Sequence, residues 1–228
     1  MSIELTILMP CLNEERTIGF CIDEAKRFID ESSISAEILI ADNGSTDRSA
    51  EIAEDMGARV VKIMATGYGN ALIGGINAAR GKYIIMGDCD MSYDFYHLDE
   101  FVKKLREGYG LVMGNRFRGE IEKGAMPFSH RYFGIPALSL AGRIRYNTSI
   151  GDFHCGIRGF DREKALSLGL KCTGMEFATE IIARFVKSGA DIAEIPVSLR
   201  KDGRNSKSHL RSIPDGLRHL KFILFEKI

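Results

Sequence analysis

Short apolar runs and helical patterns of apolar residues alternate along the first half of the chain. β-type runs occur at residues 3–9, 37–41, 59–63, 83–86 and 109–113. Between them, apolar spacings of three and four residues predict helices that begin near residues 13, 47, 67 and 96. Alternating strands and helices are typical of a parallel sheet wound with right-handed crossovers. The sequence therefore predicts an α/β domain.

The pattern changes after residue 116. Residues 117–131 are polar and contain glycine, as active-site loops often do. Helices are then predicted at residues 136–146 and 175–187, with a strand-and-turn stretch at 152–160 between them. A final strand at residues 192–199 contains Pro196, which places it at an edge of the sheet. We expect one domain over residues 1–200, made of a first half (1–115) and a second half (116–200).

The end of the chain has a different character. Residues 201–211 are rich in basic residues and contain glycine and serine, so we expect a flexible basic segment. Residues 212–228 follow a helical pattern in which Leu217, Leu220, Ile223 and Leu224 lie on one side among basic residues. Such an amphipathic helix fits a membrane surface. It fits equally well a terminal helix that packs on the domain.

Composition narrows the class of protein only slightly. The chain has 228 residues, with 31 Lys and Arg against 31 Asp and Glu, so its net charge gives no reason to expect a nucleic-acid partner. Its five cysteines are odd in number and form no C-x-x-C pair, which favours a reducing, cytosolic compartment. No signal peptide is expected, and no apolar run is long enough to predict a transmembrane helix within the chain.

The first candidate chemistry lies at Asp88 and Asp90, directly after the buried run at residues 83–86. Open α/β sheets bind ligands at the carboxyl ends of their strands. There, an Asp-x-Asp pair can hold a hard divalent cation that bridges the phosphates of a nucleotide. Alone, the pair is more typical of a polar turn, because Asp is a preferred turn residue. Three further polar loops, at residues 10–14, 42–45 and 114–116, follow strands that end at the same edge, and together they favour a binding site.

Taken together, these motifs resemble glycosyltransferase family two, which has the GT-A fold. The matching residues are 10–14 (PCLNE), 42–47 (DNGSTD), 67–71 (GYGNA) and the Asp88–Asp90 pair. Residues 114–116, 130–131, 152–158 and 174–177 and the basic tail more narrowly resemble the dolichol- and polyprenyl-phosphate sugar synthases. The resemblance covers about residues 3–222 and implies a Rossmann-like, mainly parallel sheet flanked by helices.

For the first half, the resemblance implies binding of a UDP- or GDP-linked sugar. Asp88 and Asp90 would reach a Mg²⁺ or Mn²⁺ ion on the diphosphate. Many related synthases have a glutamine two residues later, where this chain has Ser92, so Asp94 or a water would supply the third ligand. Arg204 would fold over the diphosphate. The residues expected to contact the nucleotide itself are Pro10, Asn13, Glu14, Asp42 and Gly69.

The second half would receive the acceptor. A phosphate monoester is largely ionised at neutral pH, so it needs orientation and charge compensation rather than a general base. Arg116, Arg131 and Arg158 lie where the family has phosphate-facing residues. Asp152 and Glu180 remain as a base for a hydroxyl acceptor or as partners that orient the arginines. His154 is expected to be structural.

These expectations describe an inverting, metal-dependent hexosyltransferase. It would move a hexose from a UDP- or GDP-sugar to a polyprenyl phosphate at the cytoplasmic face of a membrane, with Asp90, Arg116, Arg131, Arg158 and Glu180 as the catalytic set. One alternative is a family-two enzyme that acts on a saccharide hydroxyl, with Asp152 or Glu180 as base. Others are a non-catalytic nucleotide-sugar-binding module and, less favoured, a nucleotidyltransferase. The sequence leaves the donor base, the sugar, the lipid and the oligomeric state open.

Overall fold

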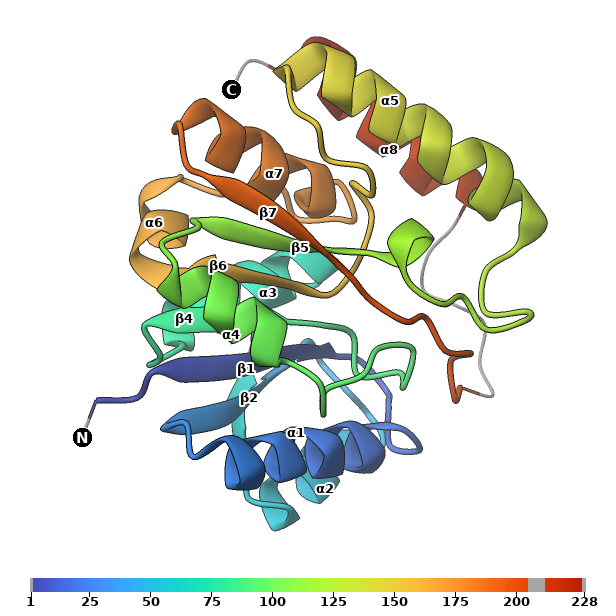
Figure 1. Cartoon of the computed structure of the whole chain (residues 1–228). Coiled ribbons are helices and arrows are strands. Elements are labelled where there is room, and N and C mark those ends of the chain that lie inside the picture. Colours follow the sequence, from blue (N-terminus) through green and yellow to red (C-terminus); the bar gives the residue numbers. More distant parts are fainter. Residues whose placement is uncertain (1, 205–211, 227–228) are drawn as a thin grey trace.

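A single mixed sheet forms the centre of the protein. The computed structural model describes residues 2–204 and 212–226. Its seven strands lie in the order β3-β2-β1-β4-β6-β5-β7 (Figure 1). All neighbouring pairs are parallel except those that β6 makes with β4 and β5. This confirms the expected mainly parallel GT-A sheet flanked by helices. The strands are β1 (Leu5–Cys11), β2 (Ala36–Asp42), β3 (Arg59–Lys62), β4 (Tyr83–Met86), β5 (Leu111–Asn115), β6 (Arg158–Asp161) and β7 (Ile192–Pro196).

Helices cover both faces of the sheet. The helices α1 (Ile18–Ser32), α2 (Ser49–Asp55) and α4 (Asp99–Arg106) pack into one apolar core. A second core on the other face contains α3 (Tyr68–Ala78), α6 (Arg162–Ser167) and α7 (Phe177–Lys187). Because successive strand residues face opposite ways, Ile7 of β1 enters the first core and Leu8 the second. The central strands are therefore apolar throughout, as is typical of sheets covered on both sides.

Two helices form an outer layer beyond α7. They are α5 (Ile135–Tyr146) and α8 (Ser212–Phe225), which lie side by side. A π-helical turn, His130–Gly134, leads directly into α5. The polar segment predicted at residues 117–131 therefore ends in helix. Residues 205–211, most of the predicted basic segment, and residues 227–228 of the predicted last helix lie outside the described residues.

The antiparallel strand β6 is the main feature that the alternating pattern did not predict. It lies between β4 and β5 and runs against both, so its first residue lies opposite the last residue of β4 and the middle of β5. Arg158 pairs with Met86 of β4 and with Met113 of β5. The inserted strand therefore delivers Arg158 to the same edge at which the parallel strands end.

Several predicted boundaries shift. α1 begins at Ile18, not near Asn13, because Asn13 adopts a left-handed conformation (φ 58°) that a helix does not accept. α4 begins at Asp99 rather than near residue 96. β7 lies at the edge of the sheet as predicted but ends at Pro196, and Leu199 makes only an isolated bridge to Ile121. The short helix α6 was not predicted.

The apolar stripe expected on the last helix is wrong in its details. α8 packs on α5 and α7 through Asp215, His219, Phe222 and Ile223, all of which are buried. Leu217 and Leu224 are 60% and 53% exposed. The expected stripe is therefore divided between the domain and solvent. Among the described residues, no helix combines the length and the apolarity needed to cross a bilayer.

Candidate active site

The polar loops after β1, β2, β4 and β5 meet at one edge of the sheet, at the right of Figure 1. The register explains this, because Cys11 at the end of β1 lies opposite Asp42 at the end of β2. The Cys89 thiol donates to the carbonyl oxygen of Pro10 (3.1 Å), which joins the loop after β4 to the loop after β1. Four separate sequence motifs thus form one surface.

The first two loops hold each other in place through Asn13 and Ser45. The backbone N–H of Asn13 donates to Ser45 Oγ (3.0 Å), and Asn13 Oδ1 accepts from the N–H of Thr46 (2.8 Å). The buried Asp42 carboxylate accepts from the N–H of Ser45 (3.2 Å). Asn13 therefore shapes a loop instead of capping a helix. Contact of Pro10, Asn13, Glu14 and Asp42 with a nucleotide stays a prediction.

Gly69 lies against the protein's own backbone. A Cβ atom there would be 2.0 Å from the carbonyl oxygen of Cys172, and the Gly69 N–H donates to the carbonyl oxygen of Thr173 (2.9 Å). The close approach that requires glycine in this structure is therefore to the segment before α7. Its approach to a nucleotide stays a prediction.

The two aspartates share a confined, negatively charged place. The Tyr68 hydroxyl donates to Asp88 Oδ1 (3.1 Å). Burial, together with the charge of Asp90, raises the pKa of Asp88 to about 6. Asp90 is itself buried, and its Oδ1 accepts from the backbone N–H (3.0 Å) and the hydroxyl of Ser92. Two carboxylates held this close would be relieved by a bound cation.

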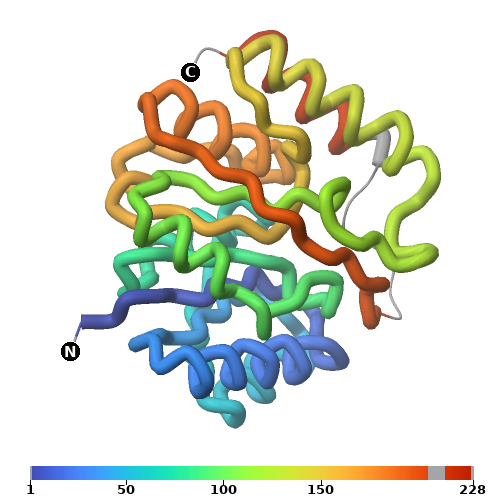
Figure 2. Tube along the Cα trace, in the orientation of Figure 1, coloured from blue at the N-terminus to red at the C-terminus, as the bar shows by residue number. Residues whose placement is uncertain are grey.

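Arg204 lies between this pair and the first loop. Its Nε is 2.6 Å from Glu14 Oε1, and its Nη2 is 3.0 Å from Asp90 Oδ2. The chain that follows β7 runs diagonally to the carboxyl ends of the strands (Figure 2), and the Gly203 N–H donates to the carbonyl oxygen of Asp90 (2.9 Å). Burial is the main reason that the pKa of Glu14 is raised even beside this guanidinium. The sequence-predicted donor residues Glu14, Asp90 and Arg204 are thus in direct contact.

The residues present fit a divalent cation that is shared with a ligand. Asp88 and Asp90 offer carboxylate oxygens, and Mg²⁺ sites commonly use one or two carboxylates together with waters and substrate phosphates. Asp94, expected as a further ligand, instead contacts Arg200 (2.8 Å) and His97 (2.8 Å). Within residues 2–204 and 212–226, no cluster of three His, Cys, Asp or Glu forms a complete metal site.

On the other side of the edge, Arg116 is held by a buried ion pair. Its Nε and Nη2 donate to the two oxygens of Asp152 at 2.7 and 2.8 Å. Asp152 is fully buried and also accepts from the backbone N–H of Arg116 (3.2 Å). Burial would lower the pKa of Arg116, but Tyr93 and the ion pair with Asp152 raise it. Asp152 therefore orients an arginine, one of the two roles that the sequence left open for it.

Arg158 is more unusual, because it is buried without a carboxylate partner among the described residues. Its side chain is 1% exposed, and its Nη atoms donate to the carbonyl oxygens of Ala178 (2.9 Å) and Cys155 (2.6 Å). Its Nε has no hydrogen-bond partner in the described structure. Burial lowers the pKa of this guanidinium. Two backbone carbonyl oxygens, rather than a hydrogen-bonded carboxylate, therefore hold this buried positive charge in the described structure.

The structure argues against Glu180 as a catalytic base. Glu180 is fully buried within α7, and its Oε2 accepts from the N–H groups of Lys171 (3.0 Å) and Cys172 (2.7 Å). Its Oε1 accepts from Arg184 Nε (2.8 Å). Both oxygens thus hold the segment before α7 and the helix itself, which is a structural task.

Arg131 stands apart from the other arginines. It is half-buried in the π-helical turn before α5, and its guanidinium lies 5.6 Å from the ring centre of Tyr132. Arg131 belongs to this turn, whereas Arg116 directly follows β5 and Arg158 begins β6. Its contact with a phosphate stays a prediction.

A pair of histidines lies behind the arginines. The ring of His154 packs edge-on against that of His219 of α8, with the centres 4.5 Å apart. His219 Nδ1 is 2.9 Å from the Thr179 hydroxyl, while neither ring nitrogen of His154 has a partner in the described structure. Burial lowers both pKa values, that of His219 to about 4. His154 is thus a neutral, inward-facing ring, in keeping with the structural role expected for it.

Sequence reasoning gave no role at the site to three residues that the structure places there. Tyr68 binds Asp88, His219 packs on His154, and Gly156 lies over Asp88. A Cβ atom on Gly156 would be 2.7 Å from Asp88 Oδ2. Tyr68 and Gly156 stand inside motifs that carry the family resemblance, so position alone could have indicated them. His219 gave no signal, because only the packing of α8 brings it near.

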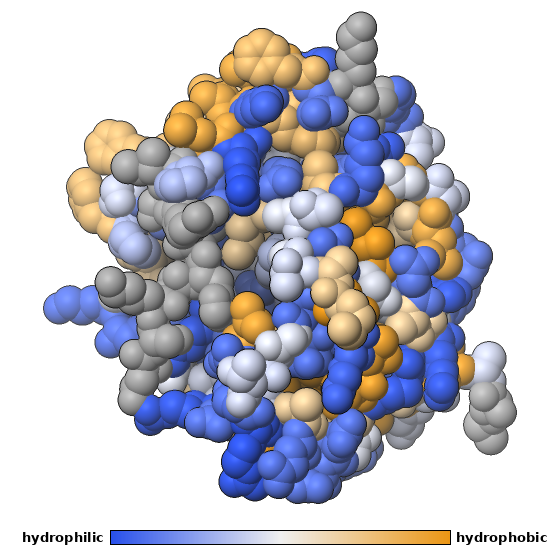
Figure 3. All heavy atoms as spheres, turned by 180° about the vertical axis from the view of Figure 1, so that it is seen from behind, coloured by the Kyte–Doolittle hydropathy of each residue, from blue (hydrophilic) through white to orange (hydrophobic). Residues whose placement is uncertain are grey.

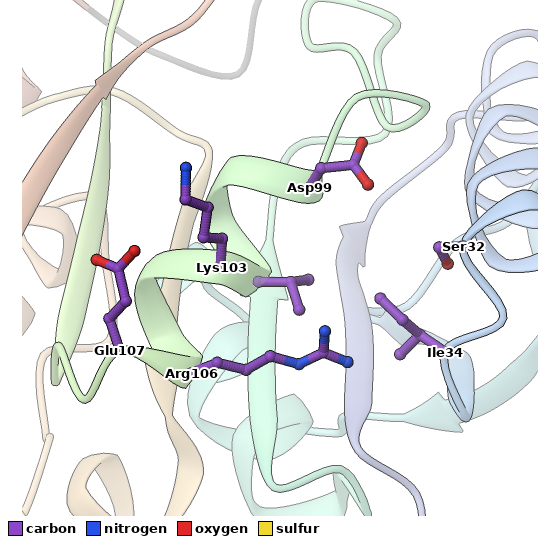
Figure 4. Close-up of a pocket in the computed structure, with 7 residues that line it drawn as sticks. Ser32, Ile34, Asp99, Lys103, Arg106 and Glu107 are labelled. Carbon is purple, nitrogen blue, oxygen red and sulfur yellow. The ribbon is translucent and has the colours of Figure 1, made fainter.

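A hollow of about 380 Å³ lies away from the site (Figure 4). It separates Ser32 and Ile34, at the turn before β2, from the α4 side chains Asp99, Lys103 and Arg106. Because β2 begins beyond this turn, the hollow lies at the opposite edge from the acidic pair. Its basic groups are already paired, Arg106 with Glu4 (2.7 Å) and Lys103 with Glu100 (3.2 Å). We assign it no part in the chemistry.

Comparison with known proteins agrees with this geometry. The sequence model described as "Glycosyl transferase family 2" matches residues 6–169. A "Low-salt glycan biosynthesis hexosyltransferase Agl6" of Haloferax volcanii is 38% identical over 96% of this chain, which spans about half (53%) of that relative. A "Dolichyl-phosphate hexose transferase" of the same organism is 32% identical, covering 90% of this chain and 86% of the relative.

A solved structure is also similar. Glucosyl-3-phosphoglycerate synthase from Mycobacterium tuberculosis, in complex with Mn²⁺, UDP and phosphoglyceric acid, has a TM-score of 0.70 and 25% sequence identity. The match covers 90% of this chain and 72% of that one. The shared fold extends through both halves of the domain.

Proposed function

The chain belongs to glycosyl transferase family 2, and we propose that it is an inverting, metal-dependent hexosyltransferase with a polyprenyl phosphate as acceptor. Its donor would be a UDP- or GDP-linked hexose. The observation that carries the acceptor is the buried Arg158 without a carboxylate partner in the described residues. A buried charge of this kind is unfavourable unless something compensates it, and a phosphate supplies the opposite charge.

Each side of the edge has a defined task in this reaction. Asp88 and Asp90 would hold a Mg²⁺ or Mn²⁺ ion, and such an ion would supply charge compensation for the departing diphosphate. Arg116, oriented by Asp152, and Arg158 orient the acceptor phosphate through charge-assisted hydrogen bonds. One phosphate oxygen attacks the anomeric carbon as the diphosphate leaves from the opposite face, which inverts the configuration.

No general base is needed for this attack, because a phosphate monoester is largely ionised at pH 7. The surroundings of the candidate bases support a reaction without a general base. Asp152 and Glu180, the two carboxylates considered for a hydroxyl acceptor, are both fully buried and bind Arg116 and Arg184. We therefore favour the phosphate acceptor over a saccharide hydroxyl.

An exposed surface with apolar and basic side chains supports the lipid part of the proposal. Phe128, Phe133 and Ile144 are 70%, 65% and 76% exposed along the turn before α5 and on α5 itself. Figure 3, seen from behind, shows apolar side chains gathered at the upper left, the corner where α5 and α8 lie. Arg143 and Arg218 are exposed on the same two helices. Apolar and basic groups together suit the anionic cytoplasmic face of a membrane.

The test measures hexose transfer from labelled UDP- and GDP-sugars to a short-chain polyprenyl phosphate in the presence of Mn²⁺. The matched control acceptor is the corresponding polyprenol, which lacks only the phosphate. We expect product with the polyprenyl phosphate and none with the polyprenol. Adding EDTA should abolish product formation. Undiminished transfer in EDTA would contradict the metal role. Transfer to a soluble saccharide but never to the lipid phosphate would contradict the acceptor, and donor binding without any turnover would indicate a binding module.

A further inference from the structure

We propose that Arg204 competes with the divalent cation for Asp90, so that the chain's own guanidinium closes the donor site until cation and nucleotide together replace it. The inference rests on the proposed function in one respect, since it takes Asp90 as a ligand of the cation. It adds a regulatory contact that neither the resemblance nor the reaction requires.

The first support is how completely Arg204 occupies its place. Its side chain is 12% exposed, and the Glu14 and Asp90 side chains that it joins are 3% and 10% exposed. Its contacts, at 2.6 and 3.0 Å, are as short as charge-assisted hydrogen bonds. This is an internal ion pair linking residues that are far apart in the chain.

The second support is that Asp90 has no spare oxygen. Oδ1 is bound by the backbone N–H and the hydroxyl of Ser92, and Oδ2 is bound by Arg204. A Mg²⁺ or Mn²⁺ ion binds carboxylate oxygen at about 2.1 Å. A guanidinium and a divalent cation on the same oxygen would repel each other strongly at that range. Cation binding therefore requires Arg204 to leave Oδ2.

The third support is the way the segment before Arg204 is anchored. Arg200 contacts Glu24 (2.7 Å) and Asp94 (2.8 Å), and its N–H donates to the carbonyl oxygen of Ser92 (2.9 Å). None of these contacts involves Asp88, Asp90 or Glu14. Arg200 thus fixes the base of the segment, while Arg204 reaches the carboxylates of Glu14 and Asp90. The guanidinium can leave Asp90 with the anchor intact.

The consequence is cooperative binding of cation and nucleotide. A cation alone must displace Arg204 and leave that positive charge without its partner. A nucleotide diphosphate supplies negative charge that compensates the displaced guanidinium. Without nucleotide, the apparent affinity for the cation is the intrinsic affinity multiplied by the fraction of molecules in which Asp90 is free of Arg204.

The experiment titrates Mn²⁺ into the nucleotide-free protein and follows free Mn²⁺ by electron paramagnetic resonance. Arg204→Gln should bind Mn²⁺ at least about tenfold more tightly than the wild type, since the competing charge is gone. Arg200→Gln is the matched control, because it loosens the same segment without touching Asp90, and it should bind like the wild type. Adding Asp90→Asn to Arg204→Gln should abolish the gain.

The melting temperature, measured with and without Mn²⁺, shows whether each variant is folded and binds the cation. Removing Arg204 leaves Glu14 and Asp90 without this countercharge, so Mn²⁺ should raise the melting temperature of Arg204→Gln more than that of the wild type. Equal Mn²⁺ affinity in wild type and Arg204→Gln, or an equal gain in Arg200→Gln, would overturn the competition. If Mn²⁺ still binds with UDP or GDP present, the proposed function survives that result. If Mn²⁺ binds to none of the proteins even with nucleotide, the metal role itself fails, and the competition with it.

Discussion

The two sides of the active edge contain opposite surpluses of buried charge. On the acidic side, Glu14, Asp88 and Asp90 gather around the guanidinium of Arg204. On the basic side, Arg116 forms an ion pair with Asp152, and Arg158 donates to backbone carbonyl oxygens rather than to a carboxylate among the described residues. The two sides meet where β4 pairs with β6.

The same physical cause acts on both sides with opposite results. Burial, reinforced by Asp90, raises the pKa of Asp88 to about 6, and burial lowers the pKa of Arg158. In each case the surroundings disfavour the charged form, and a ligand of opposite charge would restore it. The difference indicates a cation on one side and an anion on the other, which suits transfer from a metal-bound diphosphate to a phosphate.

The largest expected effect is on the acidic side. Asp90→Asn should lower kcat/KM by roughly a thousandfold, because the diphosphate loses several kcal/mol of charge stabilisation as it leaves. Steady-state transfer at saturating Mn²⁺ measures this. Asp94→Asn is the control, because Asp94 contacts Arg200 and His97, and it should change kcat/KM only a few-fold. If Asp90→Asn kept more than a tenth of wild-type activity, the proposed role of the acidic side in binding the cation would be contradicted.

The next effect concerns the basic side. Arg158→Met should lower kcat/KM for the lipid phosphate by about a hundredfold and leave nucleotide affinity unchanged, since a charge-assisted contact is worth about 1.5–3 kcal/mol. Its melting temperature should change little, because losing two hydrogen bonds is offset by removing a buried charge. Arg184→Met, which removes the partner of Glu180, should instead lower stability with little change in KM. Equal loss of donor and acceptor affinity in Arg158→Met would contradict the division into two sides.

A third effect sharpens the comparison through the neutral histidines. The pKa of His219 is lowered to about 4 in the folded protein, so the unfolded chain, with a pKa near 6.5, binds the proton first. The free energy of unfolding should therefore fall as pH decreases below about 6.5, by about 2 kcal/mol from this residue between pH 7 and pH 5. The charged and titratable groups facing the ring are Asp215, Arg158 and His154.

Denaturant unfolding across this pH range provides the measurement. His219→Gln keeps a polar partner for Thr179. Between pH 7 and pH 5, its free energy of unfolding should fall by about 2 kcal/mol less than that of the wild type. His97→Gln, at a largely exposed ring, is the control and should leave the slope unchanged. A His219→Gln protein with the wild-type slope would show that the ring is not held neutral beside Arg158.

The smallest expected effect is at Glu180. Glu180→Gln should change transfer per folded molecule by less than about threefold, because the carboxylate binds backbone and Arg184 rather than an acceptor. Stability should fall, since a buried ion pair loses one partner. Activity normalised to the folded fraction separates the two. A hundredfold loss of activity would instead identify Glu180 as a general base. That result would favour a hydroxyl acceptor.

The sequence by itself determined the parallel frame and the acidic edge. Period-two and helical spacings are local properties, and parallel strands must end at a common edge, so Asp42, Asp88 and Arg116 could be assigned to one surface before any contact was known. The same local signals misplaced the start of α1. The left-handed Asn13 is stabilised by Thr46, a residue more than thirty positions away.

Only the tertiary structure decided how the charges are partnered. Arg158 reaches the edge because β6 is inserted antiparallel, Glu180 is held by backbone N–H groups before α7, and Arg204 spans 190 positions to Glu14. Such contacts depend on strand order and on chain paths that no local spacing encodes. The residue types therefore indicated the chemistry, whereas burial and pairing determined which charges are left for a ligand.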